Sequence, residues 1–232
     1  ALPTVDLKPA FDALVEYPYG CAEQTGSRIE GLLAALNMPE SISGTPHTLL
    51  HAWASGGLQR LYWMQRFDGS MPYWRGGDAN NWLTLRTAIV VMKARDQGIE
   101  FPDGLLKGLL ENTTRIARPA NSTSNLDLAA LACRVLARGD APDKALIATL
   151  ASKSSKLNLE SRAHLADACV AVGDLETAKS LVDSFTTPDS LKSDDGGRLS
   201  SSVLQCAIAL EVITRIAPLH PIAAELVRYI DA

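Results

Sequence analysis

The residues whose types and spacing could do chemistry are a cysteine and a glutamine near the start of the chain, Cys21 and Gln24. A spacing of three places both side chains on one face of a helical turn. Pro18 and Gly20 come just before them, so we expect this turn to open a helix. A thiol held beside an amide carbonyl can displace ammonia from that amide. The product is an internal thioester between Cys21 Sγ and the side-chain carbonyl carbon of Gln24, and a thioester donates its acyl group to a nucleophile.

Ordinary structural roles account for the same two residues. Cysteine is among the residue types that are most often buried, and a glutamine in the first turn of a helix commonly caps it. A motif as short as Cys-x-x-Gln also matches by chance in many proteins. The pair alone leaves both interpretations open, and the neighbouring residues have to decide between them.

The neighbouring residues extend the motif. Before Thr25 the chain reads Tyr17-Pro18-Tyr19-Gly20-Cys21-Ala22-Glu23-Gln24. This segment resembles the thioester segment of the alpha-2-macroglobulin family, in the form found in its bacterial members. Complement components share the shorter Gly-Cys-x-Glu-Gln core. The resemblance implies that Cys21 and Gln24 form an internal thioester.

The same resemblance implies the function of an endopeptidase inhibitor. In that family a protease cleaves a bait segment elsewhere in the protein, the protein rearranges, and the exposed thioester captures the protease covalently through its lysine amines. This is one stoichiometric acylation without turnover, so we expect a protein that is not an enzyme. The expected partners are target proteases and the other domains of a parent macroglobulin, with membrane contact only indirectly, through an anchor of the parent. The implied location is periplasmic or cell-surface (extracellular), and the implied role is defence.

Residues beside the pair acquire roles from the resemblance. In the bacterial members an aromatic residue before the cysteine is thought to cover the thioester, and Tyr17 and Tyr19 are the matching positions. Ordinary packing of two aromatic rings at a helix start is the alternative. Gly20 is expected to let the backbone turn tightly. Glu23 is expected to favour the helix N-terminus as a first-turn acid, or to be a solvated surface acid.

Histidine bears on which nucleophile attacks. Complement-type domains carry a histidine well downstream of the thioester, which forms an acyl-imidazole and favours hydroxyl targets. The family would place it between residues 117 and 125, where this sequence has none, so we expect direct attack by amines. His47 and His51 share a helix face, but no acidic residue or cysteine stands beside them to complete a zinc site. We expect no metal and no cofactor.

Composition fits a globular protein and excludes some functions. The chain has 232 residues, of which 47% are hydrophobic and 21% charged, and its net charge is −4. It lacks the basic balance of nucleic-acid-binding proteins, so we expect no nucleic acid among its partners. No apolar run in the sequence is long enough to cross a bilayer. The length predicts a single domain, 1–232, which we expect to be a fragment of a larger multidomain protein.

Three further cysteines lie within apolar stretches of helical character. They are Cys133, Cys169 and Cys206, and we expect them to pack as small buried hydrophobic residues. A disulfide between Cys133 and Cys169 stays open, although no spacing rule supports it.

Apolar residues recur at helical spacing, and no window shows sustained alternation, so the expected fold class is all-α. A helix starting with Pro46 at its first position would be kinked or split at Gly56-Gly57. Asn80 or Asn81 is expected to cap the helix that follows it. Residues 37–44 and 67–78 are expected to be loops. The helices are expected at 2–16, 21–36, 46–64, 82–96, 102–117, 125–137, 142–152, 161–172, 175–185, 200–216 and 221–232.

The loops carry a second resemblance. Gln65, Asp68-Gly69 and Trp74 precede an expected helix, and Asp195-Gly196 precedes another. This arrangement resembles the terpenoid-cyclase-type α/α toroid, in which helical hairpins stack around a ring, and the thioester domains of macroglobulins and complement resemble the same toroid. The expected architecture is therefore an α/α toroid, whose last hairpin would lie beyond residue 232.

Two other functions stay open. A toroid enzyme acting on isoprenoids or lipids, like terpenoid cyclases and prenyltransferases, would need an acidic cluster or zinc ligands facing a central cavity. The candidate acids occur in glycine-rich turns, where aspartate is expected for local reasons, and they are Asp68, Asp78, Asp194 and Asp195. The third reading is a non-reactive interaction module without a thioester.

Overall fold

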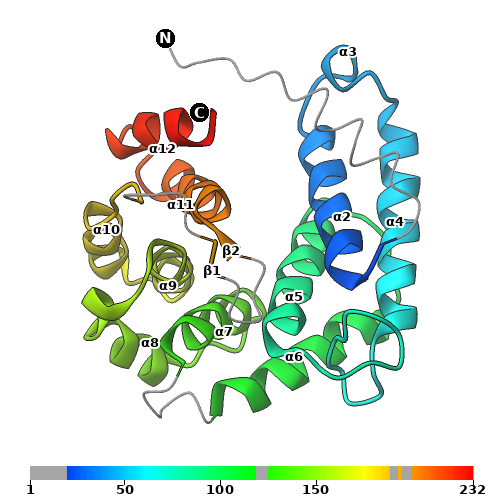
Figure 1. Cartoon of the computed structure of the whole chain (residues 1–232), viewed down its shortest axis with the longest axis horizontal. Helices are drawn as coiled ribbons and strands as arrows, with labels where there is room; N and C mark the ends of the chain where they lie inside the picture. Colours follow the sequence, from blue (N-terminus) through cyan, green and yellow to red (C-terminus); the bar gives the residue numbers. More distant parts are fainter. Residues whose placement is uncertain (1–19, 119–124, 189–192, 195–199, 232) are drawn as a thin grey trace. The chain divides into compact units, whose positions relative to one another are not determined.

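The computed structural model describes residues 20–118, 125–188, 193–194 and 200–231, most of which belong to helices (Figure 1). The described chain falls into two compact units, residues 20–113 and residues 114–231. The division lies within one helix, α6 (Asp103–Ala117). The helix expected over 2–16 lies outside the described residues.

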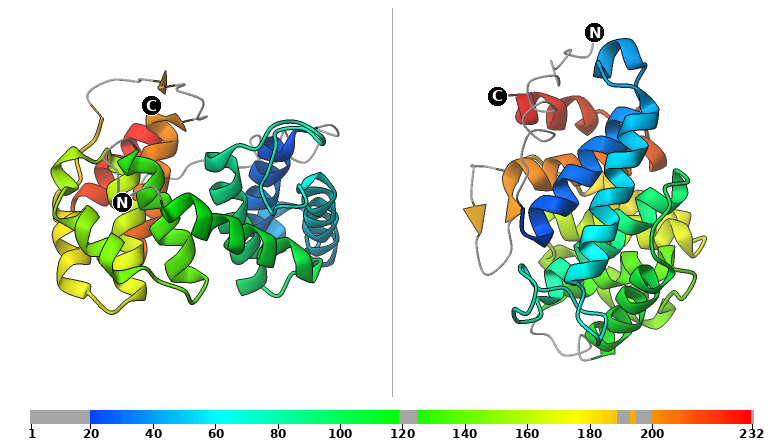
Figure 2. Two further views of the ribbon diagram at one scale, coloured as in Figure 1. Left: turned by 90° about the horizontal axis from the view of Figure 1, so that it is seen from below. Right: turned by 90° about the vertical axis from the view of Figure 1, so that its right-hand side faces the viewer.

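The N-terminal unit (residues 20–113) is organised around α2 (Ala22–Leu36). This helix packs against α4 (His47–Met64) and α5 (Asn81–Asp96), and Figure 2 shows α2 lying beside α4. Its apolar stripe is buried, with Ile29 and Leu32 each 1% exposed and Leu33 2% exposed. Burying such a side chain stabilises the fold by about 1.5–3 kcal/mol, so the packing of this stripe holds α2 in place.

A tightly bonded loop, residues 65–80, joins α4 to α5. Asp68 Oδ1 accepts hydrogen bonds from the backbone and the hydroxyl of Ser70, and the Met71 N–H donates to Thr84 Oγ1. Arg66 Nη1 donates to the Gly77 carbonyl oxygen at 2.6 Å. Asn80 then caps α5, because its Oδ1 accepts the Leu83 N–H at 2.8 Å. The loop therefore holds a defined shape.

The C-terminal unit (described residues from 114 to 231) is organised around α9 (Leu159–Ala171). Figures 1 and 2 show α9 among its neighbours, and it contacts α7 (Leu126–Arg138), α8 (Lys144–Ala151), α10 (Leu175–Asp183) and α11 (Ser202–Ile216). The helix α12 (Ile222–Asp231) packs on α11, and a short 3-10 helix, Ser154–Lys156, precedes α9. Side chains of the favoured capping types accept backbone N–H groups at five helix starts, and they are Asn125, Asp143, Asn158, Asp174 and Ser201.

Several local features differ from the sequence-based expectations. A four-residue helix, α3 (Glu40–Ser43), lies within the expected loop 37–44. Pro46 is the N-cap of α4 rather than its first helical residue, and α4 runs unbroken through Gly56 and Gly57. Two two-residue strands, Ser193–Asp194 and Ser200–Ser201, pair antiparallel just before α11. They are too short for alternation to reveal, and they leave the class all-α. Asp195-Gly196, which the sequence analysis compared with Asp68-Gly69, lies outside the described residues.

Candidate functional site

Cys21 and Gln24 meet in the first turn of α2, as their spacing predicts. Cys21 is the N-cap, and Gln24 Oε1 accepts its backbone N–H at 3.0 Å. In return the Cys21 side chain accepts the Gln24 backbone N–H, so the pair forms a capping box with sulfur in place of the usual hydroxyl oxygen. Cys21 is 8% exposed, whereas Gln24 is exposed. The turn thus brings the sulfur and the amide carbonyl group to the same end of the helix.

Residues from distant parts of the N-terminal unit hold this turn. The Ala22 N–H donates to the backbone carbonyl oxygen of Tyr73 at 2.8 Å, and Arg60 Nη2 donates to the Gly20 carbonyl oxygen at 3.0 Å. Within the helix, Thr25 Oγ1 donates to the Cys21 carbonyl oxygen at 2.9 Å. Backbone groups on both sides of Cys21 are therefore fixed by partners on α4 and on the 65–80 loop.

The structure also places two of the expected neighbours. Gly20 does not adopt a left-handed backbone conformation, and its importance is close approach, because a Cβ there would lie 3.0 Å from Gln24 Cβ. Glu23 lies in the first turn of α2, where its Oε1 accepts a hydrogen bond from Ser27 Oγ at 2.8 Å. Tyr17 and Tyr19, the expected shielding residues, lie outside the described residues.

Tyr73 is an aromatic residue at the site that the sequence did not single out. It is half-buried, and burial raises the pKa of its hydroxyl, with further increases from the negative charges of Glu23 and Cys21. Both its ring and its backbone carbonyl therefore belong to the surroundings of the first turn. Its loop is rich in aromatic residues and glycine, which was the only sequence signal for it. No spacing rule connects position 73 with position 22.

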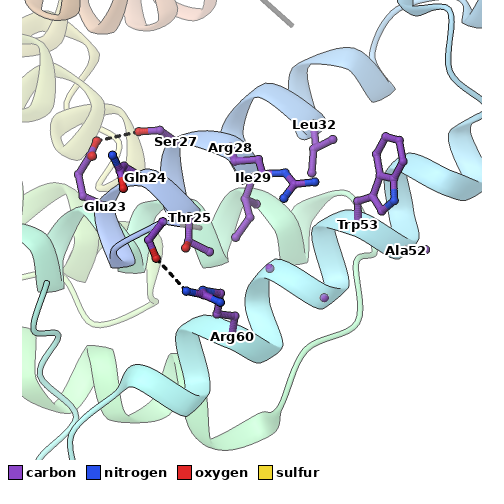
Figure 3. A pocket seen from close by; sticks show the side chains of 13 residues that line it. Glu23, Gln24, Thr25, Ser27, Arg28, Ile29, Leu32, Ala52, Trp53 and Arg60 are labelled. Atoms are coloured by element: carbon purple, nitrogen blue, oxygen red, sulfur yellow. Dashed lines mark hydrogen bonds between the residues drawn. The ribbon is translucent and has the colours of Figure 1, made fainter. Parts of the chain in front are cut away.

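A groove of about 640 Å³ lies between α2 and α4 and begins at this turn. Figure 3 shows the side chains of both helices that line it. Ile29, Leu32 and Trp53 make an apolar wall, while Gln24, Arg28 and Arg60 are polar. The side chain whose carbonyl carbon would carry the acyl group therefore borders a space large enough for part of another molecule.

The other candidate chemistries find little support in the described residues. There, no group of three or more His, Cys, Asp or Glu side chains could hold a metal ion. His47 Nε2 lies 2.9 Å from the Met38 carbonyl oxygen, which occupies one ring nitrogen. Asp68 serves its own loop through Ser70. Within the described part, no helix has the length and apolar character needed to span a membrane.

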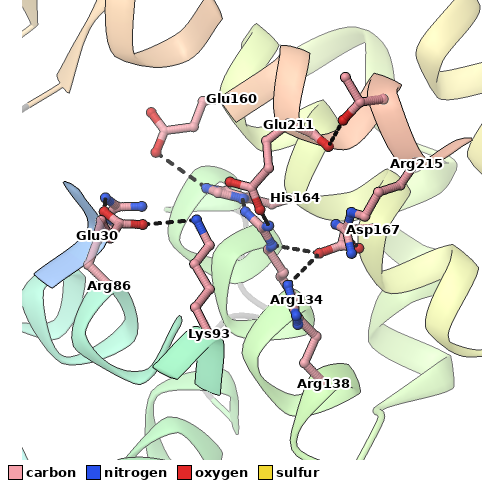
Figure 4. Close-up of polar contacts among 11 residues, drawn as sticks. Glu30, Arg86, Lys93, Arg134, Arg138, Glu160, His164, Asp167, Glu211 and Arg215 are labelled. Atoms are coloured by element: carbon pink, nitrogen blue, oxygen red, sulfur yellow. Dashed lines mark hydrogen bonds and ion pairs between the residues drawn. The ribbon is translucent and has the colours of Figure 1, made fainter. Parts of the chain in front are cut away.

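The buried charges of the C-terminal unit form a structural ion network (Figure 4). Arg134 Nε donates to Asp167 at 2.6 Å and its Nη2 donates to Glu211 at 2.6 Å, while its Nη1 lies 3.3 Å from the ring of His164. Asp167 also receives Arg215 at 2.6 Å. Burial lowers the pKa of Arg134, but the charges of Glu211 and Asp167 outweigh burial, so its pKa is raised. The network links α7, α9 and α11.

Cys133, Cys169 and Cys206 are buried as expected, and all four cysteines lie in the described part, where none is in a disulfide. Burial raises the pKa of the Cys133 thiol to about 12 and that of the Cys169 thiol to about 11, and it raises the pKa of Cys206 as well. These thiols are protonated and inert at neutral pH. Cys21 differs from them because it lies at a helix N-terminus beside a groove.

Comparison with known proteins places these features in context. No model of a known protein family matches the chain. In sequence, 111 residues are 32% identical to the alpha-2-macroglobulin of Escherichia coli (strain K12), and 117 residues are 33% identical to the alpha-2-macroglobulin of Xylella fastidiosa. The two matches cover 46% and 47% of this chain, and each spans 7% of the relative's length. The resemblance expected from the segment around Cys21 is thus confirmed in sequence.

Solved structures show the same relationship in fold. The native E. coli alpha-2-macroglobulin, determined by cryo-EM, matches with a TM-score of 0.80 and 22% identity over 99% of this chain and 15% of that chain. A crystal structure of the same protein, from domain MG7 to the C-terminus, matches with a TM-score of 0.79 and 21% identity. This match covers 96% of this chain and 37% of that chain. Salmonella alpha-2-macroglobulin reacted with methylamine matches with a TM-score of 0.79 and 23% identity, over 98% of this chain and 16% of that chain. The expected all-α, α/α-toroid class is confirmed.

Proposed function

We propose that this chain is the thioester-containing part of a bacterial alpha-2-macroglobulin-type protease inhibitor, with Cys21 Sγ joined to the Gln24 side-chain carbonyl carbon. The observation that carries the proposal is the capping box, in which Gln24 Oε1 lies 3.0 Å from the Cys21 backbone nitrogen and the sulfur faces the same turn. The similarity to bacterial alpha-2-macroglobulins supports the same assignment. We further propose that residues 1–232 form one domain of a longer protein.

The bond forms by acyl exchange within the turn. The Cys21 sulfur attacks the Gln24 side-chain carbon, a sulfur–carbon bond forms, the carbon–nitrogen bond breaks, and the nitrogen leaves as ammonia with the thiol proton. Hydrogen bonds to Arg60 and Tyr73 hold the backbone on either side of the sulfur, so the two groups need little reorganisation to react.

Capture by a lysine is the opposite exchange, in which an amine displaces the sulfur from the acyl carbon. An unprotonated lysine Nζ attacks the Gln24 carbonyl carbon, a nitrogen–carbon bond forms, and the carbon–sulfur bond breaks. Cys21 leaves as a thiolate, which takes up the proton that the nitrogen loses. The departing sulfur stays at the first turn of α2, where the Cys21 side chain accepts the Gln24 backbone N–H. The product is a stable amide, so each chain acts once and is not an enzyme.

The partners and location follow from the same proposal. Target proteases would be bound covalently through lysine, and the other domains of a parent macroglobulin would carry the bait and limit access to the site. Tyr17 and Tyr19 are proposed to shield the bond from water. A periplasmic or cell-surface location would place the chain where foreign proteases arrive.

Covalent capture in the parent protein tests the function. After cleavage by a protease, the parent should yield an adduct that survives boiling in detergent, with the Gln24 carbonyl carbon linked to a protease lysine in peptide mapping. The Cys21→Ala variant should lose the adduct, while the Cys206→Ser variant, altered at a buried thiol of α11, should keep it. Equal covalent capture by the Cys21→Ala variant would sink the proposal.

A further inference from the structure

The groove between α2 and α4 contains two guanidinium groups with unused hydrogen-bonding capacity. The Nε atoms of Arg28 and Arg60 are buried and have no hydrogen-bond partner. Among the described residues, neither side chain makes an ion pair with a carboxylate. Arg60 Nη2 donates one hydrogen bond to the Gly20 carbonyl oxygen at 3.0 Å. Since each guanidinium offers five donors and buried donors are normally satisfied, the groove is suited to an acceptor from another molecule.

The charge balance of the groove favours an anion. Arg28 and Arg60 contribute two positive charges, and Glu23 is the only acidic residue in the described lining. Glu23 is already engaged, because its Oε1 accepts the Ser27 hydroxyl at 2.8 Å. The planar fork of a guanidinium matches the geometry of a carboxylate. The apolar wall of Ile29 and Trp53 suits the aliphatic stem that carries such a carboxylate.

The groove also borders Gln24, the proposed acyl carrier. We propose that Arg28 and Arg60 form a carboxylate-binding subsite that selects amine nucleophiles carrying a carboxylate nearby, such as a lysine with an acidic neighbour. This inference rests on the proposed thioester and names the class of nucleophile that the same site prefers. By holding the carboxylate, the subsite keeps the amine of the same molecule beside the groove that Gln24 borders.

A pair of matched amines tests the preference. Butylamine and γ-aminobutyrate have the same chain length and similar basicity, but only the second carries a carboxylate. With thiol release from the intact chain as the readout, γ-aminobutyrate should react roughly five- to tenfold faster at low salt, with the ratio falling as salt screens the arginines. Equal rates at low salt would overturn the subsite while leaving the thioester intact.

Substitution of Arg28 localises the effect, since Arg28 makes no hydrogen bond that the fold of the described residues needs. Arg28→Gln should lower the ratio of the two rates toward one, because only Arg60 then remains in the subsite, and Arg28→Lys, which keeps the charge without the fork, should lower it less. The matched control is Arg95→Gln, which removes the same charge from an arginine on α5 that pairs with Asp96 at 3.0 Å. Arg95→Gln should keep the full ratio. A ratio unchanged by Arg28→Gln would contradict the proposal.

A binding measurement separates this inference from the thioester. If no amine releases a thiol, the proposed function fails, and the subsite is then judged in the Cys21→Ala variant, which cannot form the bond. Titration with acetate should shift the Nε–H nuclear magnetic resonance signals of Arg28 and Arg60 together and saturably. Absence of these shifts in a folded variant would overturn the subsite.

Discussion

At the scale of single residues, the position of Cys21 decides how its sulfur can react. As the N-cap of α2, the Cys21 side chain accepts the Gln24 backbone N–H, so its sulfur is held over the first turn of the helix. The reciprocal bond from the Cys21 N–H to Gln24 Oε1, at 3.0 Å, keeps the glutamine side chain folded back over the same turn. The glutamine side chain that we propose to react with Cys21 is therefore already held beside it.

The three other thiols should be silent in the native chain. Since the thiolate is the reactive form, pKa values raised to about 12 for Cys133 and about 11 for Cys169 leave almost no thiolate at neutral pH. Labelling of these thiols should therefore increase only as the pH rises toward their pKa values. Before methylamine treatment, the native chain should take up no thiol reagent, and afterwards only Cys21 should be labelled. Peptide mapping identifies the labelled residue. Label on Cys133, Cys169 or Cys206 in the folded protein would contradict this assignment.

Some of these residues could be predicted from the sequence and others could not. Cys21 and Gln24 were predictable because their contact lies within one helical turn. Arg60 and Tyr73 were not, because each contacts the turn across tens of residues: Arg60 stands 40 positions from Gly20. Such contacts depend on how α4 and the 65–80 loop pack against α2. Local spacing carries no signal for them.

At the scale of elements, the packing of α4 on α2 sets the groove. The two adjacent glycines in α4 face different surroundings: a Cβ at Gly57 would lie 2.8 Å from Ile29 Cγ1, whereas a Cβ at Gly56 would meet nothing within 4 Å. Gly57 therefore permits the close approach of the helices. This explains why Gly57 lies within an unbroken helix although glycine lowers helix propensity, whereas no contact explains Gly56.

The two glycines offer a matched test. Gly56→Ala should stabilise the chain by about 0.5–1 kcal/mol, because alanine is the better helix former at an open position. Gly57→Ala gains the same propensity but must displace Ile29, and overpacking costs about 1–3 kcal/mol, so it should be less stable than Gly56→Ala. Urea unfolding of the two variants measures the difference. Equal stability, or a more stable Gly57→Ala, would refute this account of the packing.

Arg134 should matter to the C-terminal unit through three helices at once. Its side chain is 0% exposed and bonds Asp167 and Glu211 at 2.6 Å each. Replacing it by methionine leaves these acids without their shared partner, although Arg215 still contacts Asp167, so Arg134→Met should destabilise the unit by about 3 kcal/mol. The surface control Arg95→Gln should stay within about 0.5 kcal/mol of the native chain. If the Arg134→Met variant unfolded at the same urea concentration as the native chain, that result would contradict this role of Arg134.

The existence and type of the helices were largely predictable, because apolar periodicity and capping residues such as Asn80 and Asp174 are local signals. The short α3 and the paired strands at Ser193–Asp194 and Ser200–Ser201 were missed. Both are shorter than the period that a pattern needs to repeat.

At the scale of the whole molecule, the chain matches 7% of the length of the relatives to which it is similar. The two residues of the proposed bond and the groove beside them all lie in the N-terminal unit, residues 20–113. Selection of a protease, by contrast, would belong to the parent protein. The bond itself can therefore be tested on the chain alone.

The most direct measurement is the intact mass of the natively purified chain. A condensed Cys21–Gln24 pair should make it lighter than the sequence mass by one ammonia, about 17 Da. Methylamine should then add its own mass at Gln24 and release one thiol. The Cys21→Ala variant should show its full sequence mass and no reaction. A native chain at full sequence mass, with an unmodified glutamine at position 24 and a thiol at Cys21 that reacts before any amine is added, would contradict the account.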